Sequence, residues 1–141
     1  MIDDATEADS AAVVALWHAC GLTRPWNDAP ADFARALGGA TSTILVARRD
    51  GVPVGSVMVG QDGHRGWLYY LAVQPAMQGQ GIGTALFHAA ERWLRERDVP
   101  KLQLMVRGDN AGAIAFYHRL GLDRQEVIVL GRFIDNANNK H

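Results

Sequence analysis

Residues 78–83 read QGQGIG, with glycine at three alternate positions, and this stretch is the most informative feature of the sequence. The apolar run WLYYLAV precedes it at 67–73, and a long amphipathic pattern follows it through Arg97. This order predicts a strand, a glycine-rich turn and a helix. Such a turn directs unpaired backbone N–H groups at one point, where they and the helix dipole favour a phosphate or pyrophosphate. Glycine lets the backbone approach the ligand closely or take a positive φ.

The composition is that of one globular domain. The chain has 141 residues, and we expect a single domain at 1–134 followed by a polar tail at 135–141. The formal net charge is −1, so no electrostatic argument favours nucleic acid or an anionic membrane as a partner. Cys20 is the single cysteine, which rules out an internal disulfide framework, and no apolar stretch is long enough to span a bilayer. We therefore expect a cytoplasmic protein.

The hydrophobic patterns around the glycine turn predict an α+β fold. Two helices come first, the second over 30–37, and strands at 43–47, 54–59 and 67–73 then form an antiparallel meander. The helix behind the glycine turn is followed by a strand at 102–106, a helix at 110–120 and a last strand at 126–133. This order predicts a mixed, mostly antiparallel central sheet flanked by helices rather than a doubly wound parallel sheet.

The spacing of the glycines limits which phosphate ligand fits the turn. A Walker P-loop ends in Gly-Lys-Ser or Gly-Lys-Thr, whereas Gly83 is followed directly by Thr84. A dinucleotide fold places its glycines after an early strand and has a different spacing, whereas this turn lies halfway along the chain. A tight turn that binds nothing is the remaining alternative, although three glycines there lower helix propensity by about 1 kcal/mol each.

Two motifs resemble those of a known family. The pattern Q-x-x-G-x-G at 78–83, preceded by LAV at 71–73, closely resembles the acetyl-CoA-binding signature of the GNAT superfamily of N-acetyltransferases. The stretch NAGAIAFY at 110–117 resembles the second family motif. The segments at 22–28 and 63–73 are similar to the bacterial subgroup typified by the YpeA-type acetyltransferases. The resemblance implies a GNAT-like fold and acetyl transfer from acetyl-CoA to a primary amine, by direct attack in a ternary complex.

The resemblance also implies which residues bind the donor. The turn would bind the CoA pyrophosphate through its backbone N–H groups, and the strand before it would pair with the pantetheine arm and direct an N–H at the thioester oxygen. The positions carried over are Leu71, Ala72, Val73, Gln78, Gly79, Gly81, Ile82, Gly83 and Thr84. Asn110 matches the family position that hydrogen-bonds the pantetheine, and it is equally a good N-cap for the helix behind it.

One catalytic residue follows from the second motif. Tyr117 matches the family's general acid, which protonates the departing thiolate, and its plain alternative is a core aromatic beside Phe116. The general base stays open, because no Asp or Glu lies between Gly63 and Gln74. His64, a tyrosine or a relayed water could take the proton. Strand alternation predicts that Tyr69 and Tyr70 lie on opposite faces, so that one of them faces the acceptor.

The acceptor is the least determined part. Trp26, Asp28 and Tyr69 are the candidate contacts, although Asp28 could equally cap the following helix. A small amine or amino acid derivative is favoured over a protein amine. His18, His88 and His118 lack metal-ligand spacing, so we expect no metal, and the last strand leaves a homodimer open. The rival hypothesis is a non-catalytic acyl-CoA-binding or regulatory domain.

Overall fold

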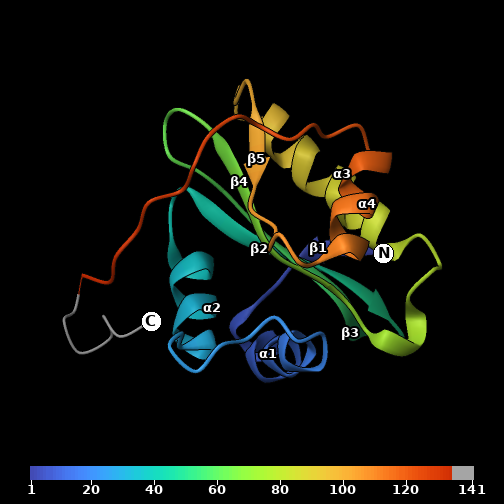
Figure 1. The fold of residues 1–141 in the computed structure, drawn as a ribbon. Helices are drawn as coiled ribbons and strands as arrows, with labels where there is room; N and C mark the ends of the chain where they lie inside the picture. The colour runs from blue at the N-terminus through green and yellow to red at the C-terminus, as the bar shows by residue number, and fades with distance from the viewer. Residues whose placement is uncertain (135–141) are drawn as a thin grey trace. The chain divides into compact units, whose positions relative to one another are not determined.

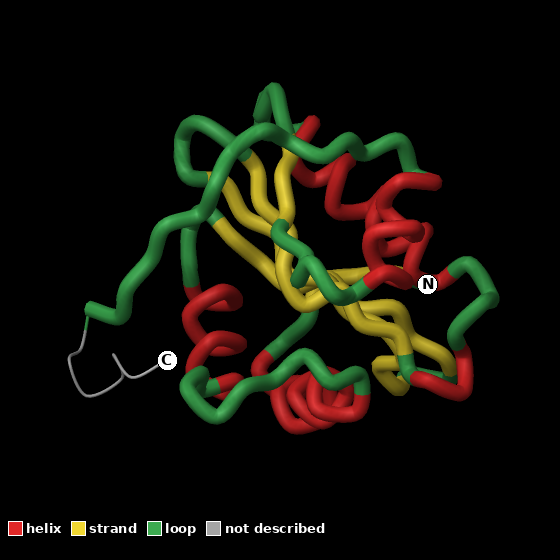
Figure 2. Tube along the Cα trace, in the orientation of Figure 1, coloured by secondary structure: helices red, strands yellow, loops and turns green. Residues whose placement is uncertain are grey.

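The computed structural model describes residues 1–134, and the predicted tail at 135–141 lies outside the described residues. The chain divides into two compact units, Met1–Met105 and a second unit that begins at Val106. Figure 1 and Figure 2 show the elements of both.

The unit Met1–Met105 is built on a five-stranded mixed sheet in the order β1-β2-β3-β4-β5. The first four strands are antiparallel neighbours, and β5 runs parallel to β4, which confirms the predicted mixed, mostly antiparallel sheet (Figure 1). The structure adds a first strand that the sequence patterns missed, because three residues are too few to show a period. The bounds are β1 Ile2–Asp4, β2 Ser42–Arg49, β3 Val52–Gln61, β4 Gly66–Val73 and β5 Leu102–Leu104.

Helices cover both faces of this sheet. The helices α1 (Ser10–Ala19) and α2 (Ala29–Gly38) lie on one face and α3 (Ile82–Arg95) on the other (Figure 1). Short 3-10 turns, η1 (Glu7–Asp9) and η2 (Pro75–Met77), precede α1 and α3. The core on the α1 and α2 face gathers large side chains that are almost fully buried, among them Trp17, Phe33, Ile44 and Val46. This core anchors α2, which carries Asp32 and Arg35 of a pocket beside β4.

The strand β4 carries a β-bulge. Ser56 of β3 pairs with Ala72 and Met58 pairs with Tyr69, so the two residues between the β4 partners face only one residue of β3. Tyr70 takes a φ of 53°, a left-handed conformation that is uncommon for any residue except glycine. The bulge interrupts the alternation of side chains along β4. It places Tyr69 and Tyr70 in the same pocket, so the prediction that they lie on opposite faces is wrong.

The second unit holds the helix α4 (Ala111–Arg119). Asn110 is the N-cap of this helix, at the predicted start, and Gly121 follows the helix with a φ of 91°. The strand predicted over 126–133 is wrong, since these residues form no strand. Val127, Ile128 and Leu130 are 69–85% exposed. Apolar and β-branched residues form a strand only where a neighbouring strand pairs with the backbone and covers the side chains, and the local pattern does not supply that partner.

Gly55 of β3 lies directly under α3, and its substitution tests the packing between the two. A Cβ at this position would lie 2.8 Å from Leu86 Cδ1, 3.1 Å from Ile82 Cγ2 and 3.2 Å from the Ala72 carbonyl oxygen. The first turns of α3 therefore pack directly on the β3 backbone. We expect Gly55→Ala to lower the free energy of unfolding by about 1–3 kcal/mol, measured by urea denaturation, because the core there has no room for a methyl group.

Gly38→Ala is the matched control for Gly55→Ala. No atom lies within 4 Å of a Cβ at Gly38, which is near the end of α2. We expect its free energy of unfolding to change by less than about 0.5 kcal/mol or to rise slightly. Equal stability of the two variants would show that α3 does not rest on Gly55.

Candidate functional site

The turn between η2 and α3 has the backbone of an anion site. Gly79 and Gly81 have φ values of 84° and 85°, and Gly81 immediately precedes α3. A Cβ at either glycine would meet no atom within 4 Å, so the turn borders open space. Within residues 1–134, the backbone N–H groups of 79–84 donate to no protein acceptor. These free donors at the positive end of a helix dipole can bind a phosphate or pyrophosphate.

The glutamines of the turn hold it in place. Gln78 Nε2 donates a hydrogen bond of 3.1 Å to the Val73 carbonyl oxygen at the end of β4. The Gln80 side-chain oxygen lies 3.4–3.5 Å from the guanidinium of Arg49 at the end of β2. The side chain of Gln78, predicted to contact the donor, therefore ties the turn to its own strand. Ile82, Gly83 and Thr84 form the first turn of α3.

One edge of β4 is partly free. β4 pairs with β5 only over 66–68, opposite 102–104. Within Met1–Met105, β3 is the only strand that pairs with the later residues of β4, and the Val73 carbonyl oxygen accepts from Gln78 Nε2 and Cys20 Sγ. A free strand edge offers N–H and C=O groups that an extended ligand can pair with like an added strand. This free edge leads directly into the turn at 78–83.

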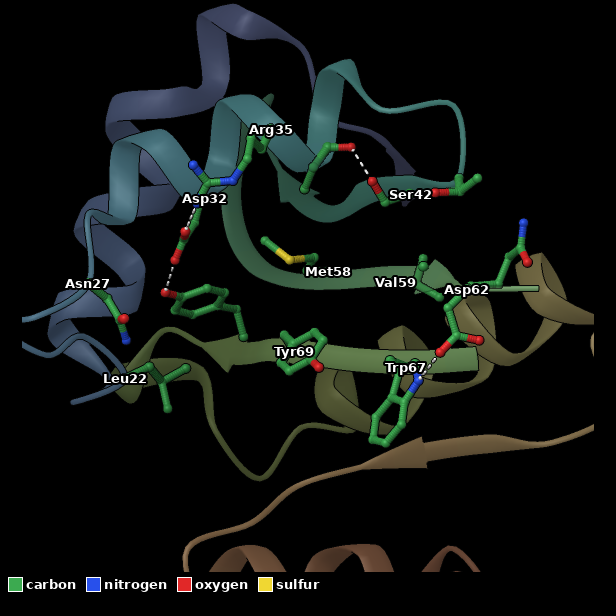
Figure 3. Close-up of a pocket in the computed structure, with 15 residues that line it drawn as sticks. Leu22, Asn27, Asp32, Arg35, Ser42, Met58, Val59, Asp62, Trp67 and Tyr69 are labelled. Atoms are coloured by element: carbon green, nitrogen blue, oxygen red, sulfur yellow. Dashed lines mark hydrogen bonds and ion pairs between the residues drawn. The ribbon is translucent and has the colours of Figure 1, made fainter. Parts of the chain in front are cut away.

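A pocket of about 650 Å³ lies beside the first half of β4, between that strand and α2 (Figure 3). Its size suits a small molecule. In Figure 3, Asp32 and Arg35 of α2 lie next to each other, Tyr69 of β4 lies across the pocket from α2, and Trp67 lies next to Asp62. The lining consists of Leu22, Asn27, Asp32, Arg35, Ala36, Thr41, Ser42, Met58, Val59, Gly60, Gln61, Asp62, Trp67, Tyr69 and Tyr70.

Tyr70 is held firmly in the wall of this pocket. Its ring stacks on Trp17 with the centroids 3.8 Å apart and the planes 7° from parallel. Its hydroxyl donates a hydrogen bond of 2.8 Å to Asp32 Oδ2, and the other carboxylate oxygen of Asp32 pairs with Arg35. Burial, together with the Asp32 carboxylate, raises the pKa of Tyr70 well above its usual value. The phenol therefore stays protonated and keeps orienting the carboxylate.

Asp62, at the other end of the pocket, is stabilised in its ionised form by hydrogen bonds. It accepts hydrogen bonds from the backbone N–H groups of Arg65 and His64 and from Trp67 Nε1, at 2.8, 2.9 and 3.1 Å. These bonds, the two backbone ones first, lower the pKa of Asp62 to about 2. Burial, and secondarily the Asp62 charge, raise the pKa of Tyr69. The neighbourhood is thus negative and contains a neutral phenol.

The structure places the three predicted acceptor contacts differently. Tyr69 lines the pocket. Asp28 is the N-cap of α2, where Oδ1 accepts from the Ala31 N–H at 3.1 Å, so the capping alternative is confirmed. Trp26 is 38% exposed and does not line this pocket, although its neighbour Asn27 does.

Asp32 and Asp62 were missed as site residues. The dipeptide Asp62-Gly63 predicts only a turn, and Asp32 lies in a stretch whose pattern predicts only a short helix. The contact from Tyr70 that distinguishes Asp32 joins residues 38 positions apart. No local sequence signal marks such a pair.

The unit that begins at Val106 carries the remaining predicted residues. Asn110 Oδ1 accepts from the Ala113 N–H at 3.1 Å and caps α4, which confirms its capping role. Tyr117 is half-buried and meets Phe116 edge to face, with the ring centroids 5.1 Å apart. Burial raises the pKa of Tyr117 to about 12. A phenol with that pKa stays protonated at any physiological pH and can donate a proton.

Two further findings apply to residues 1–134. Among these residues there is no group of three or more His, Cys, Asp or Glu side chains arranged to hold a metal ion. No helix in this described part of the chain has both the length and the apolar character needed to cross a bilayer.

Residues 7–122 match the acetyltransferase (GNAT) family. An acetyltransferase of Yersinia enterocolitica is 44% identical over 126 residues, 89% of each chain. One of Pectobacterium atrosepticum is 46% identical over 124 residues, 88% of each chain.

Two solved structures complete the comparison. An aminoglycoside N-acetyltransferase in complex with CoA has a TM-score of 0.82 at 17% identity, covering 96% of this chain and 95% of that one, which shows the common fold. The ribosomal-protein-S18-alanine N-acetyltransferase of Escherichia coli has a TM-score of 0.74 at 28% identity, covering 86% and 76%. The chain therefore belongs to the GNAT family and is an N-acetyltransferase.

Proposed function

We propose that this N-acetyltransferase moves an acetyl group from acetyl-CoA to the primary amine of a small molecule, by direct attack in a ternary complex. The observation that carries the proposal is the layout of β4. Its first half lines the 650 Å³ pocket, and its free edge leads into the open turn at 78–83. One strand thus joins a pocket for an acceptor to a cradle for a pyrophosphate.

On the donor side, the free N–H groups of 79–84 would bind the CoA pyrophosphate. The free edge at Leu71 and Val73 would pair with the pantetheine arm, and an N–H near Leu71 or Ala72 would stabilise the oxyanion that forms from the thioester carbonyl. The family motif adds Asn110, whose amide would reach the pantetheine while its oxygen caps α4. The aminoglycoside N-acetyltransferase of the same fold, whose structure contains CoA, supports the choice of donor.

On the acceptor side, a neutral amine would attack the thioester carbonyl carbon. The N–C bond forms, the C–S bond breaks, and the products are an amide and the CoA thiol. Tyr117, carried over from the family motif, would give its proton to the departing thiolate. The ammonium form would lose one proton to water before the attack, and the nitrogen would lose a second proton to water as the amide forms.

A small molecule is the acceptor class that the pocket supports, because its volume fits a drug-sized ligand. Tyr69 lines the pocket directly. Trp26, next to Asn27 of the lining, stays a predicted acceptor contact, and so does Asp28 beside it.

The proposal is tested by thiol release from acetyl-CoA in the presence of a panel of primary amines. We expect amine-dependent release well above the rate of acetyl-CoA hydrolysis without an amine, and one added acetyl group on the consumed amine by mass spectrometry. A reaction without protein is the blank. Tight acetyl-CoA binding with no amine-dependent release on any member of the panel would contradict the proposal.

A further inference from the structure

We infer that the acceptor is a cationic primary amine on an apolar or aromatic body, without a carboxylate next to the amine, and that Asp32 binds its ammonium group. This inference rests on the proposed function, because it assigns the 650 Å³ pocket to the acceptor. Three observations support it: the charges of the lining, the fixed direction of the Asp32 carboxylate, and the aromatic side chains in the wall.

The lining has an excess of negative charge. It contains two carboxylates, Asp32 and Asp62, and one guanidinium, Arg35, so its formal charge is two negative and one positive, or −1. Arg35 is already paired with Asp32. Asp62 accepts only from neutral donors. The pocket as a whole is therefore negative, which attracts a cationic ligand and repels the carboxylate of an amino acid.

The carboxylate of Asp32 is fixed in direction. One oxygen accepts from the Tyr70 hydroxyl and the other pairs with Arg35, which leaves one lone pair on each oxygen for a ligand. Tyr70 is itself immobilised by the stack on Trp17, whose Nε1 donates to the buried Ser56 Oγ at 3.0 Å. The positive φ of Tyr70 is a conformation that costs free energy and persists where the surroundings require it. Here it directs the phenol at Asp32.

Aromatic side chains form part of the wall. Trp67 and Tyr69 both line the pocket together with Met58. The indole N–H of Trp67 is already bonded to Asp62, so the side chain offers the ligand a ring rather than a donor. Aromatic rings bind both cations and apolar bodies. Because acetylation removes the positive charge, the amide product would lose the attraction to Asp32 and dissociate more easily than the substrate binds.

The test uses matched pairs that differ only by a carboxylate next to the amine: phenethylamine with phenylalanine, and tryptamine with tryptophan. Binding to the CoA-loaded protein is measured by calorimetry. We expect the dissociation constant of each amine to be at least about tenfold lower than that of its amino acid. Equal or tighter binding of the amino acids would overturn the inference, and so would the absence of binding by all four compounds.

Asp32→Asn tests the carboxylate itself. Asparagine has nearly the same shape and can still accept from the Tyr70 hydroxyl, so the variant removes mainly the charge. We expect it to raise the dissociation constant of phenethylamine by about 10- to 50-fold and to leave that of acetyl-CoA unchanged. The matched control is Asp98→Asn, the same change in an exposed turn after α3, where asparagine tolerates the positive φ of 58°. Equal phenethylamine binding by Asp32→Asn and Asp98→Asn would overturn the inference.

Tyr70→Phe tests the positioning role of the phenol. The ring can still stack on Trp17, and only the hydrogen bond to Asp32 is lost. We expect a rise of about three- to tenfold in the phenethylamine dissociation constant, with the acetyl-CoA dissociation constant and the melting temperature unchanged. Unchanged amine binding would overturn the positioning role of Tyr70. The two proposals have different readouts. If the protein does not transfer acetyl groups, thiol release is missing while the protein still binds amines more tightly than amino acids.

Discussion

Gly81→Val is expected to weaken acetyl-CoA binding by at least about 100-fold. The residue has a φ of 85°, a conformation that costs a β-branched side chain on the order of 1–3 kcal/mol. The space beyond its missing Cβ is empty, so a valine would project into the volume that the pyrophosphate occupies in the proposed complex. The turn would also no longer direct the N–H groups of 79–84 at one point.

The loss for Gly81→Val is measured by calorimetry with acetyl-CoA. Gly63→Val is a matched control, because Gly63 has a φ of 88° and also has no atom within 4 Å of its Cβ position. It precedes β4, whereas Gly81 follows that strand, and the eight residues of β4 span about 26 Å. We expect the control to bind acetyl-CoA like the wild type. Indistinguishable dissociation constants for the two variants would place the pyrophosphate elsewhere.

Tyr117→Phe is expected to lower kcat by about 100-fold and to change the acetyl-CoA dissociation constant less than about twofold. The variant keeps the ring that meets Phe116 edge to face and removes only the hydroxyl. The expected loss is within the usual contribution of a general acid, because the step that it assists is protonation of a thiolate. Steady-state kinetics at saturating amine gives the comparison.

The pH dependence of Tyr117 has a definite sign. Burial raises its pKa from the usual value near 10 to about 12, so the proton-donating form persists through the whole neutral range. The wild-type kcat is therefore expected to show no fall caused by Tyr117 between about pH 7 and pH 10. Phe116→Leu is the packing control, expected to lower the melting temperature and to keep kcat within about threefold. A Tyr117→Phe enzyme as fast as the wild type would assign Tyr117 to packing alone.

The elements that the sequence predicted correctly are those with local signals. Asp28 and Asn110 mark two helix starts because a short polar side chain can accept a backbone N–H three residues on. The glycines around 81 mark the turn because positive φ is tolerated there without a Cβ. Two wrong predictions concern strands: one was expected over 126–133 and does not form, and the one at Ile2–Asp4 was missed. A strand forms only by pairing with another strand, which a local pattern does not show.

The two halves of the proposed site divide in the same way. The donor half is a continuous piece of chain, a strand, a glycine turn and a helix start, and short-range backbone geometry encodes all three. Sequence patterns alone were therefore enough to predict the family and the turn at 78–83. The acceptor half was decided by tertiary structure alone. A bulge in β4 brings Tyr70 to the same side as Tyr69, and the Tyr70 hydroxyl meets Asp32 of a helix 38 residues earlier. Strand register and helix packing create that pair, and neither is written in the order of neighbouring residues.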